Sequence, residues 1–144
     1  MYRRILVPVD GSDHSHLAAE HAMRLAVQFE ATIDALFVVE QSGPSGHWDF
    51  EVEKQEAVGE EALDRIAELG EKRGVAVERH LRRGVPSEEI VDAATDYGVD
   101  LIVMGTQGRT GISRIATAGS TTERVVRLTA VPTTVVGGAG AGKE

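Results

Sequence analysis

The sequence contains no cysteine among its 144 residues. Disulfide frameworks, thiolate metal sites and cysteine nucleophiles are therefore excluded, and the composition suits a reducing compartment. Long apolar runs are also missing, since none approaches the roughly 18 residues that a membrane-spanning helix needs. The apolar run after the N-terminal charges is too short for the core of a signal peptide. These absences lead us to expect a cytoplasmic protein without a membrane partner.

Basic charge is scarce as well. The chain has 15 Lys and Arg against 23 Asp and Glu, which gives a formal net charge of −8. General nucleic-acid binding requires a basic face, so we expect no nucleic-acid partner. The acidity is consistent with simple solubility, and a phosphate site would have to be basic locally. Apolar residues make up 42% of the chain, enough for one domain with one core.

Four short apolar runs are rich in β-branched residues and bounded by turn residues, which is typical of strands buried on both faces of a parallel sheet. They are Ile5–Val9, Ile33–Val39, Leu101–Met104 and Thr133–Val136. A fifth segment, Val75–Arg82, alternates apolar and charged residues, which favours an edge strand. The sequence therefore predicts five strands.

Helical patterns separate these strands. The predicted helices follow a cap at Ser12 or Asp13, span Asp49–Arg73, open at Pro86-Ser87, and follow a capping box at Ser120–Glu123. This alternation predicts a doubly wound α/β domain, with a five-stranded parallel sheet in the order 3-2-1-4-5 and helices on both faces. Residues 41–49 are expected to form a mobile loop and residues 138–144 a flexible Gly-rich tail, which leaves residues 1–137 as the single domain.

Ligands of such sheets bind beyond the carboxyl ends of the strands, at the point where the strand order reverses. In the expected order this point lies between the first and fourth strands. The most distinctive residues follow those two strands, at Pro8–Ser12 and in the glycine-rich stretch Gly105–Ser120. A different strand order would separate the two loops.

The stretch Gly105–Ser120 holds four glycines and ends at a helix start. Glycine lets backbone N–H groups approach an anion closely, and a helix N-terminus adds partial positive charge. Only one acid, Glu123, lies between Gly105 and Arg127, among four arginines: Arg109, Arg114, Arg124 and Arg127. From the residues alone two interpretations stay open, a phosphate-binding loop and a flexible loop before an ordinary capped helix.

The spacing Gly105-x-x-Gly108 followed by Gly119-Ser120 resembles the nucleotide loop of the universal stress protein family. The resemblance extends over nearly the whole chain, through RRILVPVDGSDHS, ALFVVE, RRGVPSEEIVDAA, GVDLIVMGTQGRTG, GSTTERVVR and VPTTVV. It implies a five-stranded parallel α/β domain that is often dimeric. The family has an ATP-binding branch and a non-binding branch, and the glycine loop is similar to that of the ATP-binding branch.

The resemblance also implies which residues hold the nucleotide. They are Pro8, Val9, Asp10, Val38, Gly84, Val85, Gly105, Gly108, Arg109, Gly119, Ser120 and Thr121. Asp10 would contact the ribose, the other residues up to Val85 would surround adenine, and those from Gly105 onward would line the phosphates. From the residues alone, Asp10 could instead be a turn or capping residue, and Val38 and Val85 could belong to the core.

One departure from the family pattern lies in the loop, because Arg109–Ala118 contains one residue more than usual. The extra residue puts the preference for ATP over ADP or AMP in doubt. The resemblance implies an ATP-binding regulatory or stress-response module with at most slow hydrolysis. Any Mg²⁺ would be held mainly by the phosphates, since Asp10 is the only acid placed near the phosphate loop. No nucleophile–base pair is visible in the sequence. A homodimer is expected through Thr133–Val136, and the alternative is a structural dimerisation module without a ligand.

Overall fold

The computed structural model describes residues 1–40, 48–106 and 120–137, without the side chains of Asp13, residues 48–51 and Ser120. The predicted loop at 41–49 and tail at 138–144 therefore lie largely outside the described residues. The strands are β1 (Arg4–Pro8), β2 (Thr32–Glu40), β3 (Val77–Gly84), β4 (Leu101–Gly105) and β5 (Thr133–Val136). They form one parallel sheet in the order β3-β2-β1-β4-β5, which confirms the predicted fold class and strand order.

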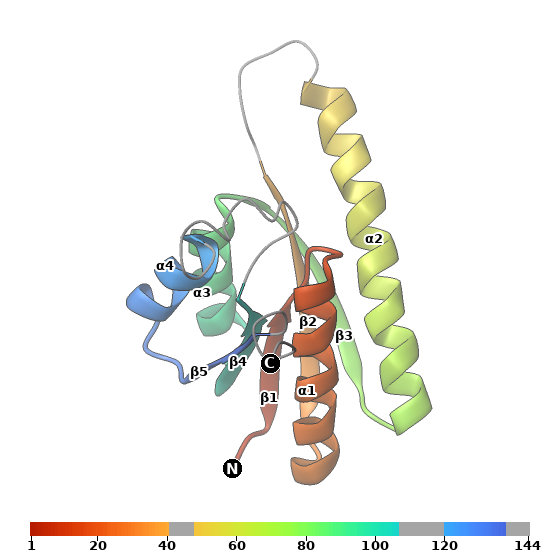
Figure 1. Ribbon diagram of the computed structural model, residues 1–144, viewed down its shortest axis with the longest axis vertical. Helices are drawn as coiled ribbons and strands as arrows, with labels where there is room; N and C mark the ends of the chain where they lie inside the picture. The colour runs from red at the N-terminus through yellow and green to blue at the C-terminus, as the bar shows by residue number, and fades with distance from the viewer. Residues whose placement is uncertain (41–47, 107–119, 138–144) are drawn as a thin grey trace, which may run out of the picture.

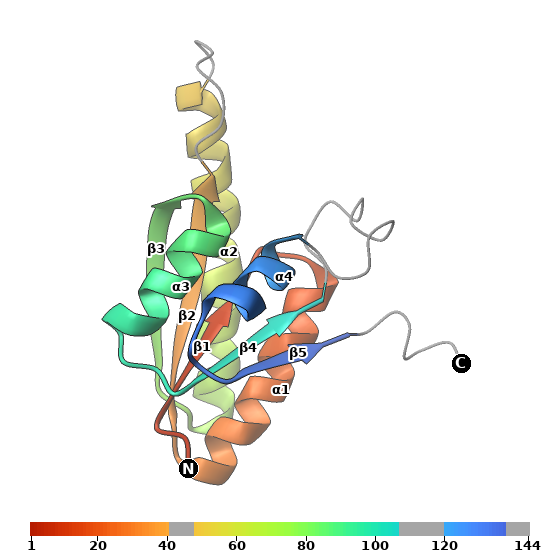
Figure 2. The ribbon, with the colours of Figure 1, turned by 90° about the vertical axis from the view of Figure 1, so that its left-hand side faces the viewer.

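Helices cover both faces of this sheet (Figure 1). One face carries α1 (Asp13–Phe29) and α2 (Trp48–Arg73). The other carries α3 (Pro86–Asp96) and α4 (Ser120–Leu128), and Figure 2 shows the molecule from that side. In the part of the chain that the structure describes, no helix has the length and apolar character needed to cross a membrane.

Because helices bury the sheet on both faces, its inner strands are continuous apolar runs. Successive strand residues point to opposite faces, so a strand covered on both faces must be apolar at every position. In β1, Ile5 and Val7 pack beneath α1 and α2, whereas Leu6 packs beneath α3 and α4. All three side chains are completely buried. The core is therefore split into two layers by the sheet.

The helix ends follow local sequence signals in most cases. The Ser12 hydroxyl accepts the N–H of Ser15 at 3.2 Å and caps α1, which decides between the two predicted caps. Gly74 and Gly98, with φ of 74° and 66°, follow α2 and α3, and glycine commonly ends a helix in this left-handed conformation. Glu30 ends α1 with a φ of 58°, a left-handed conformation that nothing in the sequence indicated.

The interior of α2 contains glycines that the helical pattern leaves unexplained. A Cβ atom at Gly59 would lie 2.3 Å from the ring of Phe37 in β2. A Cβ atom at Gly70 would lie 2.5 Å from Val77 in β3. Both glycines therefore let the helix lie closer to the sheet than any side chain would allow.

This close packing predicts that Gly59→Ala lowers the free energy of unfolding, whereas a glycine-to-alanine change in a helix usually raises it. In an exposed helix the change would stabilise the protein by about 1 kcal/mol through helix propensity. Here the new methyl group meets a buried aromatic ring, so we expect a loss of about 1–3 kcal/mol in the free energy of unfolding. Denaturant unfolding measures the change, with Ala57→Gly on the exposed side of α2 as the propensity control. A gain in stability for Gly59→Ala would contradict the packing argument.

Candidate functional site

The reversal of strand order places the loop after β1 beside the end of β4, as the sequence analysis expected. A Cβ atom at Gly105, the last residue of β4, would lie only 2.7 Å from the backbone carbonyl of His14 in the first turn of α1. The carbonyl of Gly105 also accepts the hydroxyl of Thr122 in α4 at 2.7 Å. Close packing between two helices therefore accounts for glycine at this position. Thr121, beside Thr122, is half-buried at the same end of the sheet.

The chain turns sharply after β1. Asp10 Oδ1 accepts the N–H of Ser12 at 2.9 Å, and Gly11 adopts a φ of 85°. Asp10 is therefore a turn residue, the alternative that its sequence position left open. No hydrogen bond to Oδ2 of this half-buried carboxylate comes from the described residues, so the turn leaves one oxygen available for a ligand.

The backbone of Val38 faces the end of β1. The N–H of Val9 donates to Leu36 at 2.8 Å, whereas the N–H of Ile33 donates to Ala76 on the β3 side at 2.9 Å. Backbone groups of successive strand residues point to alternate sides, so both the N–H and the C=O of Val38 point toward β1. Paired residues of β1 end at Pro8, and no described residue hydrogen-bonds either group. We call these two groups the Val38 edge.

The end of β3 lies beside the end of β2, next to Val38. Gly84 has a φ of 146°, and a Cβ atom there would lie 2.7 Å from Oε2 of Glu89. Val85 follows as the N-cap residue of α3 and is 44% exposed. The core role considered for Val85 is therefore wrong. Val38 itself is half-buried and packs against the layer beneath α3 and α4.

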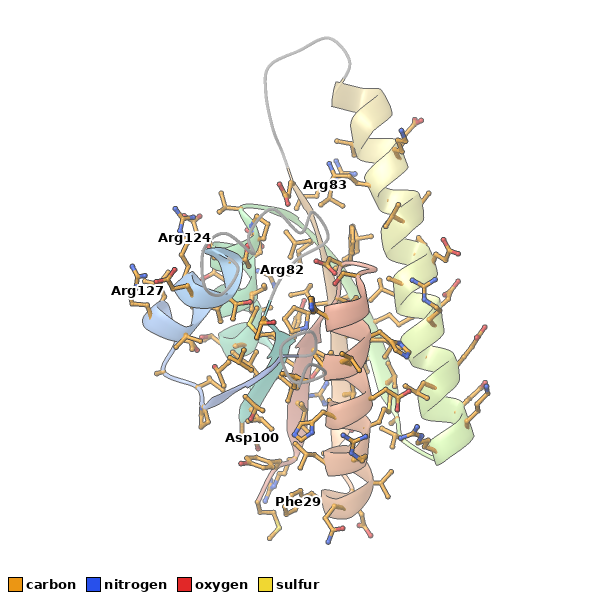
Figure 3. The ribbon with its side chains drawn as sticks, in the orientation of Figure 1. Phe29, Arg82, Arg83, Asp100, Arg124 and Arg127 are labelled. Atoms are coloured by element: carbon orange, nitrogen blue, oxygen red, sulfur yellow. The ribbon has the colours of Figure 1, made fainter. Side chains whose placement is uncertain are left out.

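The predicted phosphate-binding residues are described only in part. Gly108, Arg109 and Gly119 lie outside the described residues, and so does the side chain of Ser120, which begins α4. Two of the arginines that made this stretch look basic are described, Arg124 and Arg127. Figure 3 shows both projecting away from the sheet, and Arg127 pairs with Glu123 at 3.2 Å. Both described arginines therefore extend toward solvent rather than toward the ends of the strands.

Two consecutive arginines tie the end of β3 to the helices on either face (Figure 3). Arg82 donates to Glu89 at 2.8 Å and to Asp96 at 3.1 Å, both in α3. Its contact with the hydroxyl of Tyr97 and then that with Glu89 raise the pKa of Arg82. Arg83 pairs instead with a glutamate of α2 on the opposite face. The end of β3, which pairs with β2 at Val38, is therefore held by helices on both faces of the sheet.

A buried charge cluster, which sequence analysis missed, lies on the α3 face of the sheet. Asp34 is completely buried and accepts two hydrogen bonds from Arg4, at 3.0 and 2.7 Å, and one contact from His80 at 2.9 Å. Arg4 also reaches Glu78 at 3.1 Å, and the hydrogen bond to Asp34 leads the causes that raise the pKa of Arg4. The signal that could have revealed it is a lone Asp34 within an apolar run.

The cluster contains the chemistry of a metal site. Ligand atoms of Asp34, Glu78 and His80 lie within 4.8 Å of one another, the one such group in the described parts of the chain. However, a single Arg4 nitrogen already contacts both carboxylates. The guanidinium therefore supplies the positive charge that a metal would bring, and the cluster is explained as a structural ion network.

Removing Arg4 should consequently be costly. Arg4→Met leaves the buried carboxylate of Asp34 without its cation, and breaking a buried pair costs about 3–5 kcal/mol. We expect the lower end of that range, because the Arg4 side chain is 32% exposed. Denaturant unfolding measures the loss, and Arg3→Met at the exposed neighbouring position serves as the matched control. Equal effects of the two substitutions would contradict the assigned role of Arg4.

Comparison with known proteins gives a consistent result. The model of the universal stress protein family matches residues 1–137. Universal stress protein MJ0531 of Methanocaldococcus jannaschii is 40% identical over 141 residues, which cover 94% of this chain and 82% of that protein.

Solved structures agree with the sequence comparison. The structure of hypothetical protein MJ0577, a universal stress protein of the same organism, has a TM-score of 0.81 at 33% identity, covering 96% of this chain and 97% of that one. A universal stress protein in complex with cAMP has a TM-score of 0.69 at 27% identity, covering 94% and 97%. The cAMP is bound by that protein, and the hydrogen-bonding groups of its adenine base can be compared with those of the Val38 edge.

Proposed function

The chain belongs to the universal stress protein family, and we propose that it binds an adenine nucleotide, with ATP as the ligand, in the crevice where the strand order reverses. Binding rather than turnover is the proposed activity. The nucleotide would stabilise one conformation of a regulatory or stress-response module, and any hydrolysis would be slow. Any Mg²⁺ would be held mainly by the phosphates.

The Val38 edge is the observation that carries this proposal. A backbone N–H and C=O that point together into a crevice offer one donor and one acceptor. Adenine presents the complementary pair, an acceptor at N1 and a donor at the 6-amino group. Neither group has a hydrogen-bond partner among the described residues, and a bound base would satisfy both. Pro8 at the end of β1, Val9 after it and Val85 beyond β3 would then bracket the base with apolar surface.

Asp10 suits the ribose for a separate reason. Its carboxylate is fixed by the turn through Oδ1, which leaves Oδ2 to accept a sugar hydroxyl. The phosphates would extend from there past Gly105 and Thr121 to the loop that contains Gly108, Arg109, Gly119 and Ser120. The presence of cAMP in a relative with the same fold supports an adenine nucleotide as the ligand class.

Calorimetry on nucleotide-stripped protein tests the proposal. We expect ATP to bind the wild-type chain, and Gly108→Val to remove measurable binding, because a branched side chain blocks close approach of the backbone to a phosphate. Denaturant unfolding of the variant should match the wild type, as a control for its fold. No heat of binding at millimolar ATP would contradict the proposal and favour the structural dimerisation module. Full affinity in Gly108→Val would refute the phosphate assignment.

We further propose that two copies pair through β5. This strand lies at one edge of the sheet, and Val135 on it is 39% exposed. The neighbouring α4 exposes Val126 and Leu128 at 50% and 58%. An edge strand beside exposed apolar residues is suited to pairing with a second chain.

Val135→Pro tests this pairing with little harm to the fold. Pro132 and Val136 direct their backbone carbonyls to β4, so the N–H of Val135 points to the outer edge. Proline removes that donor without breaking the bonds to β4. Light scattering should give the mass of two chains for the wild type and for Val135→Thr, and of one chain for Val135→Pro. A two-chain mass for the proline variant would overturn pairing through β5.

We propose that residues 1–137, the span that the family model matches, form one nucleotide-binding domain. We also propose a cytoplasmic location, which the cysteine-free composition supports.

A further inference from the structure

Gln55 of α2 makes a two-way contact with the end of β2. Its Oε1 accepts the N–H of Glu40 at 2.8 Å, and its Nε2 donates to the C=O of Glu40 at 3.1 Å. A side-chain amide presents the same donor and acceptor as a peptide group, so Gln55 pairs with Glu40 as a neighbouring strand would. Among the described residues, Gln55 has no core contact or ion pair that accounts for an amide at this position.

This contact lies on the same edge of β2 as the backbone groups of Val38. Residues two apart in a strand direct their backbone groups to the same side, so Glu40, like Val38, faces the β1 side. Figure 1 shows β2 extending past β1 toward the first turns of α2. Gln55 therefore takes the place that a longer β1 would occupy, one step beyond the Val38 edge.

We infer that Gln55 is a positioning residue for base recognition, which it serves by holding the end of β2 so that the Val38 edge keeps its direction. This inference rests on the proposed function. On the β1 side, Val38 lies between two fixed points, the hydrogen bond from Val9 to Leu36 and the clamp from Gln55 to Glu40. Without the contact between Gln55 and Glu40, the β1 side of β2 is fixed only by the hydrogen bond at Leu36, which precedes Val38.

Loss of the Gln55 contact should change nucleotide affinity according to the base that the nucleotide carries. Fixing the backbone of one residue shifts an equilibrium by roughly tenfold. We therefore expect Gln55→Ala to weaken ATP binding by roughly tenfold. Inosine triphosphate carries the reverse pattern, a donor at N1 and an acceptor at C6, so it gains little from the Val38 edge when the ribose is held in place. Its affinity should hardly change.

Two more variants sharpen the test. Gln55→Glu keeps the acceptor for the N–H of Glu40 but loses the donor to its carbonyl, so the loss should approach that of Gln55→Ala. Glu56→Ala removes the neighbouring contact of α2 with Arg83 on β3 and leaves the Glu40 clamp intact. It controls for general loosening of α2, and its ratio of ATP to inosine triphosphate affinity should stay at the wild-type value.

Calorimetry with ATP and with inosine triphosphate on the four full-length proteins gives these ratios. Support is a fall of roughly tenfold in the ratio for Gln55→Ala, together with an unchanged ratio for Glu56→Ala. Equal losses for both nucleotides, or an unchanged ratio in Gln55→Ala, would overturn the inference while wild-type ATP binding preserves the proposed function. A wild-type chain that binds no ATP would overturn the proposed function and the inference together.

Discussion

The early end of β1 is the constraint on which the site depends. The pairing of β1 with β2 stops at Pro8 and Leu36, while β2 runs on to Glu40 beside β3. The chain cannot follow, because the turn at Asp10 leads it into α1. The mismatch in strand length leaves the backbone of Val38 facing the crevice. The sheet therefore leaves a main-chain donor and acceptor at this edge that no described residue hydrogen-bonds.

The surrounding structure holds this edge from several directions. Gly105 lets the end of β4 press against the first turn of α1, which follows the turn after β1. Gly59 lets α2 lie close to β2, and the same helix delivers Gln55 to Glu40. On the other face, the Arg4–Asp34 network sits in the strands below the site. Close packing of the helices against the sheet thus constrains the positions of the strand ends.

Sequence reasoning predicted the fold well because its signals are local. Apolar runs such as Ile5–Val7, and the helix stops at Gly74 and Gly98, identify the strands and helix ends directly. The candidate site was predicted mainly by family resemblance, and Gly108, Arg109 and Gly119 of its glycine loop lie outside the described residues. The buried Asp34 network and the Gln55 clamp were missed, since each joins residues far apart in sequence. The direction of Arg124 and Arg127, which project away from the sheet, was also missed, because a linear count of charges ignores which way a helix turns its side chains.

The central claim is that the backbone of Val38 reads the base. Amide hydrogen exchange of Val38, followed residue by residue by nuclear magnetic resonance, tests it most directly. The account predicts that saturating ATP slows exchange of the Val38 N–H, and that saturating inosine triphosphate does not, because hypoxanthine offers no acceptor at N1. Exchange at Val38 that is unaffected by ATP, or slowed equally by both nucleotides, would contradict the account.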